Sequence, residues 1–308
     1  MRYLLPLLLV TFSRITHGGS GLKFDASTPL YTRDSNAYAV KDLSLALNAV
    51  RKAGKPIVLF IHGRGDEPGK SLRAKKSLLG LGSAVSMLEN QYGTAVLMFN
   101  WDSKAASMKD RSRPLGNMAA AAEGLHAVIL ELQSYYSKDP SMKPVVLLAH
   151  SMGTIVVQRY VEKYGWPAGR IFANVLFTSA DADNLEHAKW VERISAVERV
   201  YITINPRDKM LNGSSDLRPS ESRALGLDPG KLLAADTFYV EVYQTGAHEI
   251  FNTGTMKGRP AVCRFFRDVL TGETPDFDAL SAKTVANNRY QLRSGKAKKD
   301  VCFGKPSN

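Results

Sequence analysis

Residues 143–160 constrain the fold more than any other stretch, because an apolar segment there turns through a serine into a segment of helical spacing. Residues 145–148 are continuously apolar and follow Pro144, which is typical of a strand buried on both faces of a parallel sheet. Residues 154–161 then take helical spacing. The sequence Ala-His-Ser-Met-Gly over 149–153 has to turn sharply between them, which predicts a strand–turn–helix unit with Ser151 at its tip.

Ser151 in such a turn projects its hydroxyl above the sheet edge, next to the free N–H groups of the helix N-terminus. Small residues are needed two positions before and after the serine, because neighbouring backbone crosses closely there. Gly153 meets this need, and Ala149 replaces the more usual glycine. We therefore take Ser151 as a candidate nucleophile, the alternative being a serine that only caps the helix.

Strands and helices alternate along the rest of the chain, without a detectable repeat. This predicts an α/β fold in one domain, with a doubly wound, mostly parallel sheet. Binding sites of such sheets lie beyond the carboxyl ends of the strands. Residues with chemically capable side chains are predicted at that edge: His62, Trp101, Ser151, Asp181, Asp208 and His248. A long excursion over 212–236, rich in Gly, Ser, Asp and Pro, follows one strand and is expected to be functional or partly mobile.

The first residues predict export. Arg2 is followed by an apolar run over 3–12, and then by small and polar residues up to Gly21, as in a secretory signal peptide. The run is too short to span a bilayer. We expect a signal peptide over 1–21, a periplasmic or extracellular protein, and a folded domain over 22–280.

The formal net charge is +12, and much of the excess lies in a predicted basic tail over 281–308. The tail could contact an anionic surface, but no basic motif interleaved with aromatic residues predicts nucleic-acid binding. The chain has two cysteines, Cys263 and Cys302, too few for a disulfide scaffold or a zinc site. In an exported protein they could form a disulfide that fastens the tail to the domain.

The loop over 62–71 has two interpretations. Gly69-Lys70-Ser71 resembles the end of a phosphate-binding loop, but that motif requires a glycine at position 64, which is Arg64. Alternatively, His62-Gly63 ends an inner strand, and the main-chain N–H of Arg64 points at a reacting oxygen. We favour the second interpretation, and the first leaves a nucleotide-binding protein as an alternative function.

The chain resembles the α/β-hydrolase superfamily over about residues 40–272. The resemblance rests on four segments in the family's order: Phe60-Ile61-His62-Gly63, residues 149–153, Arg207-Asp208 and Gly246-Ala247-His248. It is most similar to a poorly characterised bacterial branch of serine esterases. The resemblance implies acyl transfer to water through an acyl-enzyme, without a metal or another cofactor.

In that scheme Ser151 is the nucleophile, His248 the general base and Asp208 the acid that orients the histidine. Asp181 also ends a strand and remains an alternative acid. The N–H groups of Arg64 and Met152 would bind the oxyanion. We therefore expect a secreted carboxylic ester hydrolase acting on a small-molecule or lipid ester, with a catalytically silent binding domain on the same scaffold as a further alternative. We expect a structural role for His62.

Overall fold

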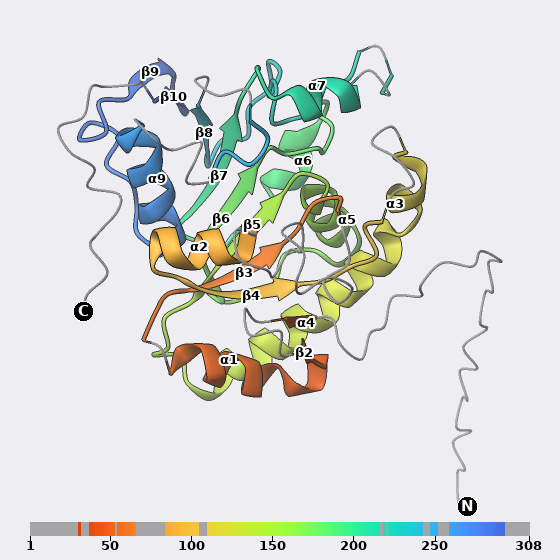
Figure 1. Cartoon of the computed structure of the whole chain (residues 1–308), viewed down its shortest axis with the longest axis vertical. Coiled ribbons are helices and arrows are strands. Elements are labelled where there is room, and N and C mark those ends of the chain that lie inside the picture. Colours follow the sequence, from red (N-terminus) through yellow and green to blue (C-terminus); the bar gives the residue numbers. More distant parts are fainter. Residues whose placement is uncertain are drawn as a thin grey trace, which may run out of the picture.

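The computed structural model describes residues 30–31, 37–52, 54–65, 84–104, 110–215, 218–219, 221–242, 247–251 and 259–292 (Figure 1). The predicted signal peptide over 1–21, the Gly69-Lys70-Ser71 sequence and Cys302 lie outside these residues. None of the described helices combines the length and the apolar composition that a membrane span requires.

The strands of the described residues form one sheet, in the order β2-β1-β4-β3-β5-β6-β7-β8-β10-β9. The central strands, which run parallel to one another, are β3 (Ile57–Ile61), β4 (Ala95–Phe99), β5 (Val145–His150), β6 (Phe172–Thr178), β7 (Arg199–Ile204) and β8 (Thr237–Glu241). Nearly every residue of these strands is buried, because helices cover both faces of the sheet. The predicted doubly wound α/β fold in one domain is confirmed.

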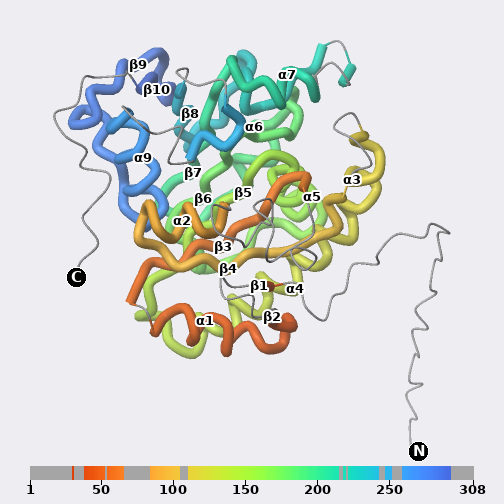
Figure 2. Tube along the Cα trace, viewed as in Figure 1, coloured from red at the N-terminus to blue at the C-terminus, as the bar shows by residue number. Residues whose placement is uncertain are grey.

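Alternate residues along each strand face two separate apolar layers. Figure 2 shows helices on both sides of the sheet. One layer packs the sheet against α1 (Leu43–Arg51), α4 (Met118–Lys138), α5 (Gly153–Tyr164) and α6 (His187–Val191). The other packs it against α2 (Ala84–Tyr92) and α9 (Pro260–Leu270).

Short strands extend both edges of the sheet. The pair β1 (Leu30–Tyr31) and β2 (Ala37–Tyr38) is antiparallel, and β1 lies antiparallel to β4. At the other edge β10 (Arg289–Gln291) runs parallel to β8, and β9 (Lys283–Ala286) runs antiparallel to β10. The first part of the segment predicted as a basic tail is therefore part of the sheet. Cys263 in α9 is buried and disulfide-bonded, while its predicted partner lies outside the described residues.

The described part of the excursion after β7 is folded onto the sheet edge. It begins with α7 (Lys209–Ser215). The main chain then returns to the end of β6, where Gly226 N–H donates to Ala180 O at 2.9 Å and Leu225 N–H donates to Ala182 O at 2.8 Å. A Cβ on Gly226 would lie 2.5 Å from Ala180 N, so this close approach requires glycine. The excursion thus forms a wall next to the predicted site.

Candidate functional site

Ser151 lies between β5 and α5 in a strained turn. Its φ of 54° lies in the left-handed region, which residues other than glycine seldom adopt. A Cβ on Gly153 would lie 2.4 Å from Ile61 O, and one on Gly63 would lie 2.6 Å from Ser151 Cβ. The backbone after β3 therefore crosses against the serine turn, and both glycines are required by that contact. The predicted strand–turn–helix unit is confirmed.

His248 and Asp208 form a close pair. His248 Nδ1 lies 2.8 Å from Asp208 Oδ2 and 3.1 Å from Asp208 Oδ1. Since a carboxylate only accepts, Nδ1–H is the donor, and Nε2 of the neutral ring remains able to accept a proton. The Asp208 side chain is fully buried, and its Oδ1 also accepts from the N–H groups of Met210 and Leu211 at the start of α7. These bonds fix the carboxylate in one orientation.

Two further polar side chains hold the backbone around His248. Ser179, at the end of β6, donates its hydroxyl to His248 O at 2.5 Å. Asn205, at the end of β7, donates to Ala247 O at 3.2 Å. The backbone around the histidine after β8 is therefore attached to the end of β7, which neighbours β8, and to the end of β6 beyond it.

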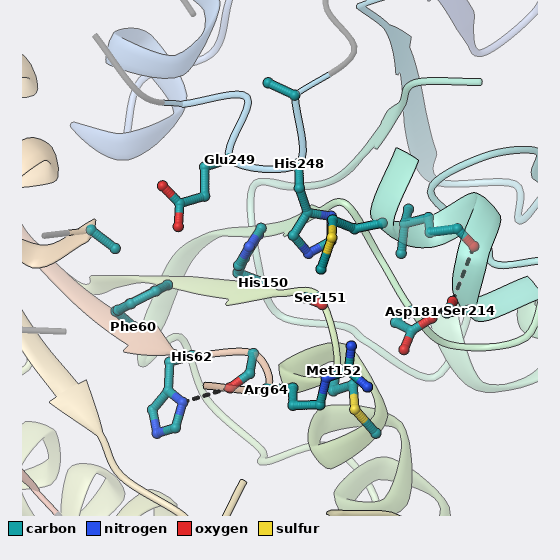
Figure 3. A pocket seen from close by; sticks show the side chains of 15 residues that line it. Phe60, His62, Arg64, His150, Ser151, Met152, Asp181, Ser214, His248 and Glu249 are labelled. Carbon is teal, nitrogen blue, oxygen red and sulfur yellow. Dashed lines mark hydrogen bonds between the residues drawn. The ribbon is translucent and has the colours of Figure 1, made fainter. Parts of the chain in front are cut away.

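A cavity of about 450 Å³ opens at this edge of the sheet. Ser151 and His248 both line it, and Figure 3 shows the His248 ring directed towards Ser151. Arg64 and Met152 line the cavity on the other side of the serine (Figure 3). Asp208 is buried behind His248. The structure thus brings Ser151, His248, Asp208, Arg64 and Met152 together around one cavity.

The main-chain N–H groups of Arg64 and Met152 are placed on two sides of Ser151. Arg64 follows Gly63, the residue in contact with the serine, and Met152 follows the serine itself. Neither N–H donates a hydrogen bond to another part of the described chain. Two such groups are the usual donors of an oxyanion hole in a strand–turn–helix site. Their role here stays a prediction.

Asp181, the alternative acid, has different partners. Its Oδ2 lies 2.6 Å from Arg111 Nη1, and its Oδ1 lies 2.7 Å from Arg218 Nη2 and accepts from Ser214 Oγ at 2.6 Å. Burial alone would raise the pKa of Asp181, but the two guanidinium charges and the hydrogen bonds hold it below its ordinary value. Asp181 therefore joins the excursion to the segment before α4, and Asp208 is the carboxylate that contacts the histidine.

Two more histidines lie buried at the site. The His150 ring packs against the His248 ring with centroids 4.7 Å apart, and its Nδ1 lies 3.1 Å from Thr178 Oγ1. Burial, and to a smaller extent the charge of His248, lowers the pKa of His150 well below its ordinary value. Burial also lowers the pKa of His62 to about 4. His62 stacks on Trp101, whose indole N–H donates to His62 O at 2.8 Å, so the structural role expected for His62 agrees with its contacts.

Sequence reasoning misses several of these residues. Arg111 and Arg218 come from irregular segments without a motif, so only the folded chain reveals that they meet Asp181. His150 is part of the serine turn, yet the turn motif leaves that position open. The described residues contain no group of three or more His, Cys, Asp or Glu side chains arranged to hold a metal ion.

A family model described as "Alpha/beta hydrolase of unknown function (DUF900)" matches residues 36–268. No curated protein matches the chain in sequence.

Similar solved structures include two lipid or ester hydrolases by title. One is a cold-adapted esterase from an Arctic intertidal metagenomic library, at 13% identity and a TM-score of 0.38, covering 66% of this chain and 80% of that one. Another is a monoacylglycerol lipase of Paleococcus ferrophilus, at 15% identity and a TM-score of 0.37, covering 70% of this chain and 96% of that one.

Proposed function

Because this chain belongs to the family of alpha/beta hydrolases of unknown function (DUF900), we propose that it is a serine hydrolase of carboxylic esters that acts through an acyl-enzyme on Ser151. In this proposal His248 is the general base and Asp208 orients it. The N–H groups of Arg64 and Met152 bind the oxyanion. Small-molecule or lipid esters are the proposed substrates.

One observation carries the proposal. The 2.8 Å contact between Asp208 and His248 Nδ1 leaves His248 Nε2 as the proton acceptor, and the ring is directed towards a serine whose backbone is held in a strained conformation (Figure 3). A serine hydroxyl becomes an effective nucleophile when a histidine removes its proton during attack. A buried carboxylate on the far nitrogen keeps the ring in the required tautomer.

The reaction follows in two steps. Ser151 Oγ attacks the ester carbonyl, and its proton passes to His248 Nε2, which then protonates the departing alcohol. Water attacks the acyl-enzyme next and gives its proton to the same nitrogen, which passes it to Ser151 Oγ as the acid leaves. Both tetrahedral intermediates carry a negative oxygen, which the two main-chain N–H groups stabilise. Losing one such donor typically lowers kcat by about 100- to 1,000-fold.

Hydrolysis of an activated aryl ester tests the proposal. We expect Ser151→Ala to lose nearly all activity, whereas Ser195→Ala, at an exposed serine outside the cavity, should keep it. Activity should also survive a metal chelator. Full activity in Ser151→Ala, or loss of activity to the chelator alone, would overturn the mechanism. A protein whose Ser151 stays unmodified by every acylating probe would instead be a silent binding domain.

We also propose that the protein is exported. The support is the sequence of residues 1–21, which lie outside the described part of the chain. N-terminal sequencing of the protein from the producing cell should give a mature start between residues 14 and 22. An intact Met1 in the cytosolic fraction would contradict export.

A further inference from the structure

We propose that the Arg64 side chain binds a second, anionic group of the substrate, so that the preferred esters carry a carboxylate in their acyl or alcohol part. This inference rests on the proposed hydrolase function and names its substrate class. It concerns the guanidinium group, whereas the oxyanion role above concerns only the main-chain N–H of the same residue.

The Arg64 guanidinium lines the cavity and has no carboxylate partner among the described residues. Within the described part of the chain, the guanidinium makes one hydrogen bond, from Nη1 to the main-chain oxygen of Asp110 at 3.2 Å. No acidic side chain among the described residues lies within ion-pair distance of it. Arginine offers five N–H donors in a planar fork that suits a carboxylate. Most of these donors therefore remain available to a ligand.

Asp181 also lines the cavity, but it cannot serve as a carboxylate partner for Arg64. Arg111 occupies one of its oxygens, and Arg218 and Ser214 occupy the other. Arg218 also pairs with Asp183, so the inner cluster of Asp181, Asp183, Arg111 and Arg218 is formally neutral. The excess positive charge on this side of the cavity, among the described residues, is therefore that of Arg64.

The cavity's other acidic group lies at the opposite end. Figure 3 shows Glu249 beyond His150, whereas Arg64 lies next to Met152 on the far side of Ser151. The cavity is therefore polarised, with the positive end next to Arg64. An anionic substituent placed there gains charge-assisted hydrogen bonds, while a neutral substrate supplies no anionic partner for the guanidinium in a partly desolvated site.

The experiment compares kcat/KM for matched ester pairs. The acyl pair is mono-4-nitrophenyl glutarate and 4-nitrophenyl pentanoate. The alcohol pair is 3-acetoxybenzoate and phenyl acetate. We expect the anionic member to be preferred by about 10- to 100-fold in at least one pair at low salt, as a charge-assisted contact of this kind provides. The preference should shrink as ionic strength rises.

Two variants test whether Arg64 is the residue responsible for the anionic preference. Arg64→Met removes the charge and retains the main-chain N–H, so the ratio between the two esters should fall to about one even if the common catalytic step also changes. Arg193→Met, at an exposed position outside the cavity, removes the same charge and should keep the ratio of the parent protein. A preference that survives Arg64→Met, or no anionic preference in either pair, would overturn the inference.

A binding measurement separates this inference from the proposed function. The Ser151→Ala protein should bind monophenyl glutarate in a calorimetric titration, and the double variant Ser151→Ala/Arg64→Met should bind it at least 10-fold more weakly. Equal binding by the two proteins rules out Arg64 as the anion site, even if the parent protein is an active esterase. Conversely, ester hydrolysis that survives Ser151→Ala would reject the catalytic scheme but not the role of Arg64. The comparison of binding by the two variants does not depend on turnover.

Discussion

At the scale of single residues, the backbone of Ser151 is strained and firmly held. A non-glycine residue at positive φ costs about 1–3 kcal/mol and persists only where neighbouring structure fixes it. Ser151 N–H donates to Thr178 O at 3.0 Å, while Ser151 O accepts from Thr154 N–H at 3.1 Å and Asp181 N–H at 3.2 Å. The end of β6 therefore fixes the serine in place, so its hydroxyl has a defined direction before any substrate arrives.

The two buried aspartates at this edge predict different mutant phenotypes. Asp208→Asn should lower kcat by about four orders of magnitude with little change in folding, because an amide no longer selects the correct histidine tautomer. Asp181→Asn should leave most of the activity of the folded protein. Its unfolding free energy should drop by about 3–5 kcal/mol, because Arg111 loses its buried partner and Arg218 keeps only Asp183.

Steady-state kinetics and urea unfolding of both variants check this pair. The two variants should differ: Asp208→Asn should have the lower kcat, and Asp181→Asn should have the lower unfolding free energy. The reverse ranking in kcat would move the acid to the end of β6.

At the scale of elements, the site depends on how closely β3 and the turn after β5 approach each other. The carbonyl of Ile61 and the first turn of α5 meet where Gly153 has no side chain. Both proposed oxyanion donors flank this contact, since Arg64 follows β3 and Met152 precedes α5. Their separation is therefore set by main-chain packing.

Gly153→Ala tests that dependence. Its Cβ would lie 2.4 Å from Ile61 O and 2.7 Å from His62 O, so the strand and the turn must move apart. We expect a loss of about 1–3 kcal/mol of unfolding free energy and a larger proportional loss of kcat than of substrate affinity. Gly116→Ala is the matched control, since a Cβ there meets nothing within 4 Å. If Gly153→Ala behaved like the control, the proposed geometry of the oxyanion donors would be wrong.

The pattern of residues within a single segment predicts those elements of the fold whose formation depends on that segment alone. Continuous apolar runs predict the central strands, and their carboxyl ends predict that Ser151, Asp208 and His248 share one edge. The short helix α7 contains Gly213, and β9 is exposed throughout, so neither has an apolar pattern that would predict it. The choice between Asp208 and Asp181 depends on Arg111 and Arg218, whose approach is a property of the folded chain.

At the scale of the whole molecule, burial keeps several histidines uncharged. Burial lowers the pKa values of His62, His150 and His187, that of His62 to about 4. The unfolded chain binds protons at these residues near the ordinary pKa of about 6.5, whereas the folded chain does not. Acid therefore favours the unfolded state, and stability should fall as pH drops below about 6.5.

Urea unfolding at pH 7.5, 6 and 5 measures this effect. His62 alone should contribute a loss of up to about 3 kcal/mol between its unfolded pKa and about pH 4, at about 1.4 kcal/mol for each pH unit. The variant His62→Gln, though less stable at pH 7.5, should lose less stability on acidification than the parent protein. Equal unfolding free energies of the parent at pH 7.5 and pH 5 would show that the buried histidines do not behave as described.

The central claim is that Ser151 is a nucleophile activated by His248, and covalent labelling tests it most directly. The full chain is treated with a fluorophosphonate, digested, and mapped by mass spectrometry. The account predicts one label per protein molecule, on Ser151, with a labelling rate at least 100-fold lower in His248→Ala. A label on another residue, or a Ser151 labelled equally fast without His248, would contradict the account.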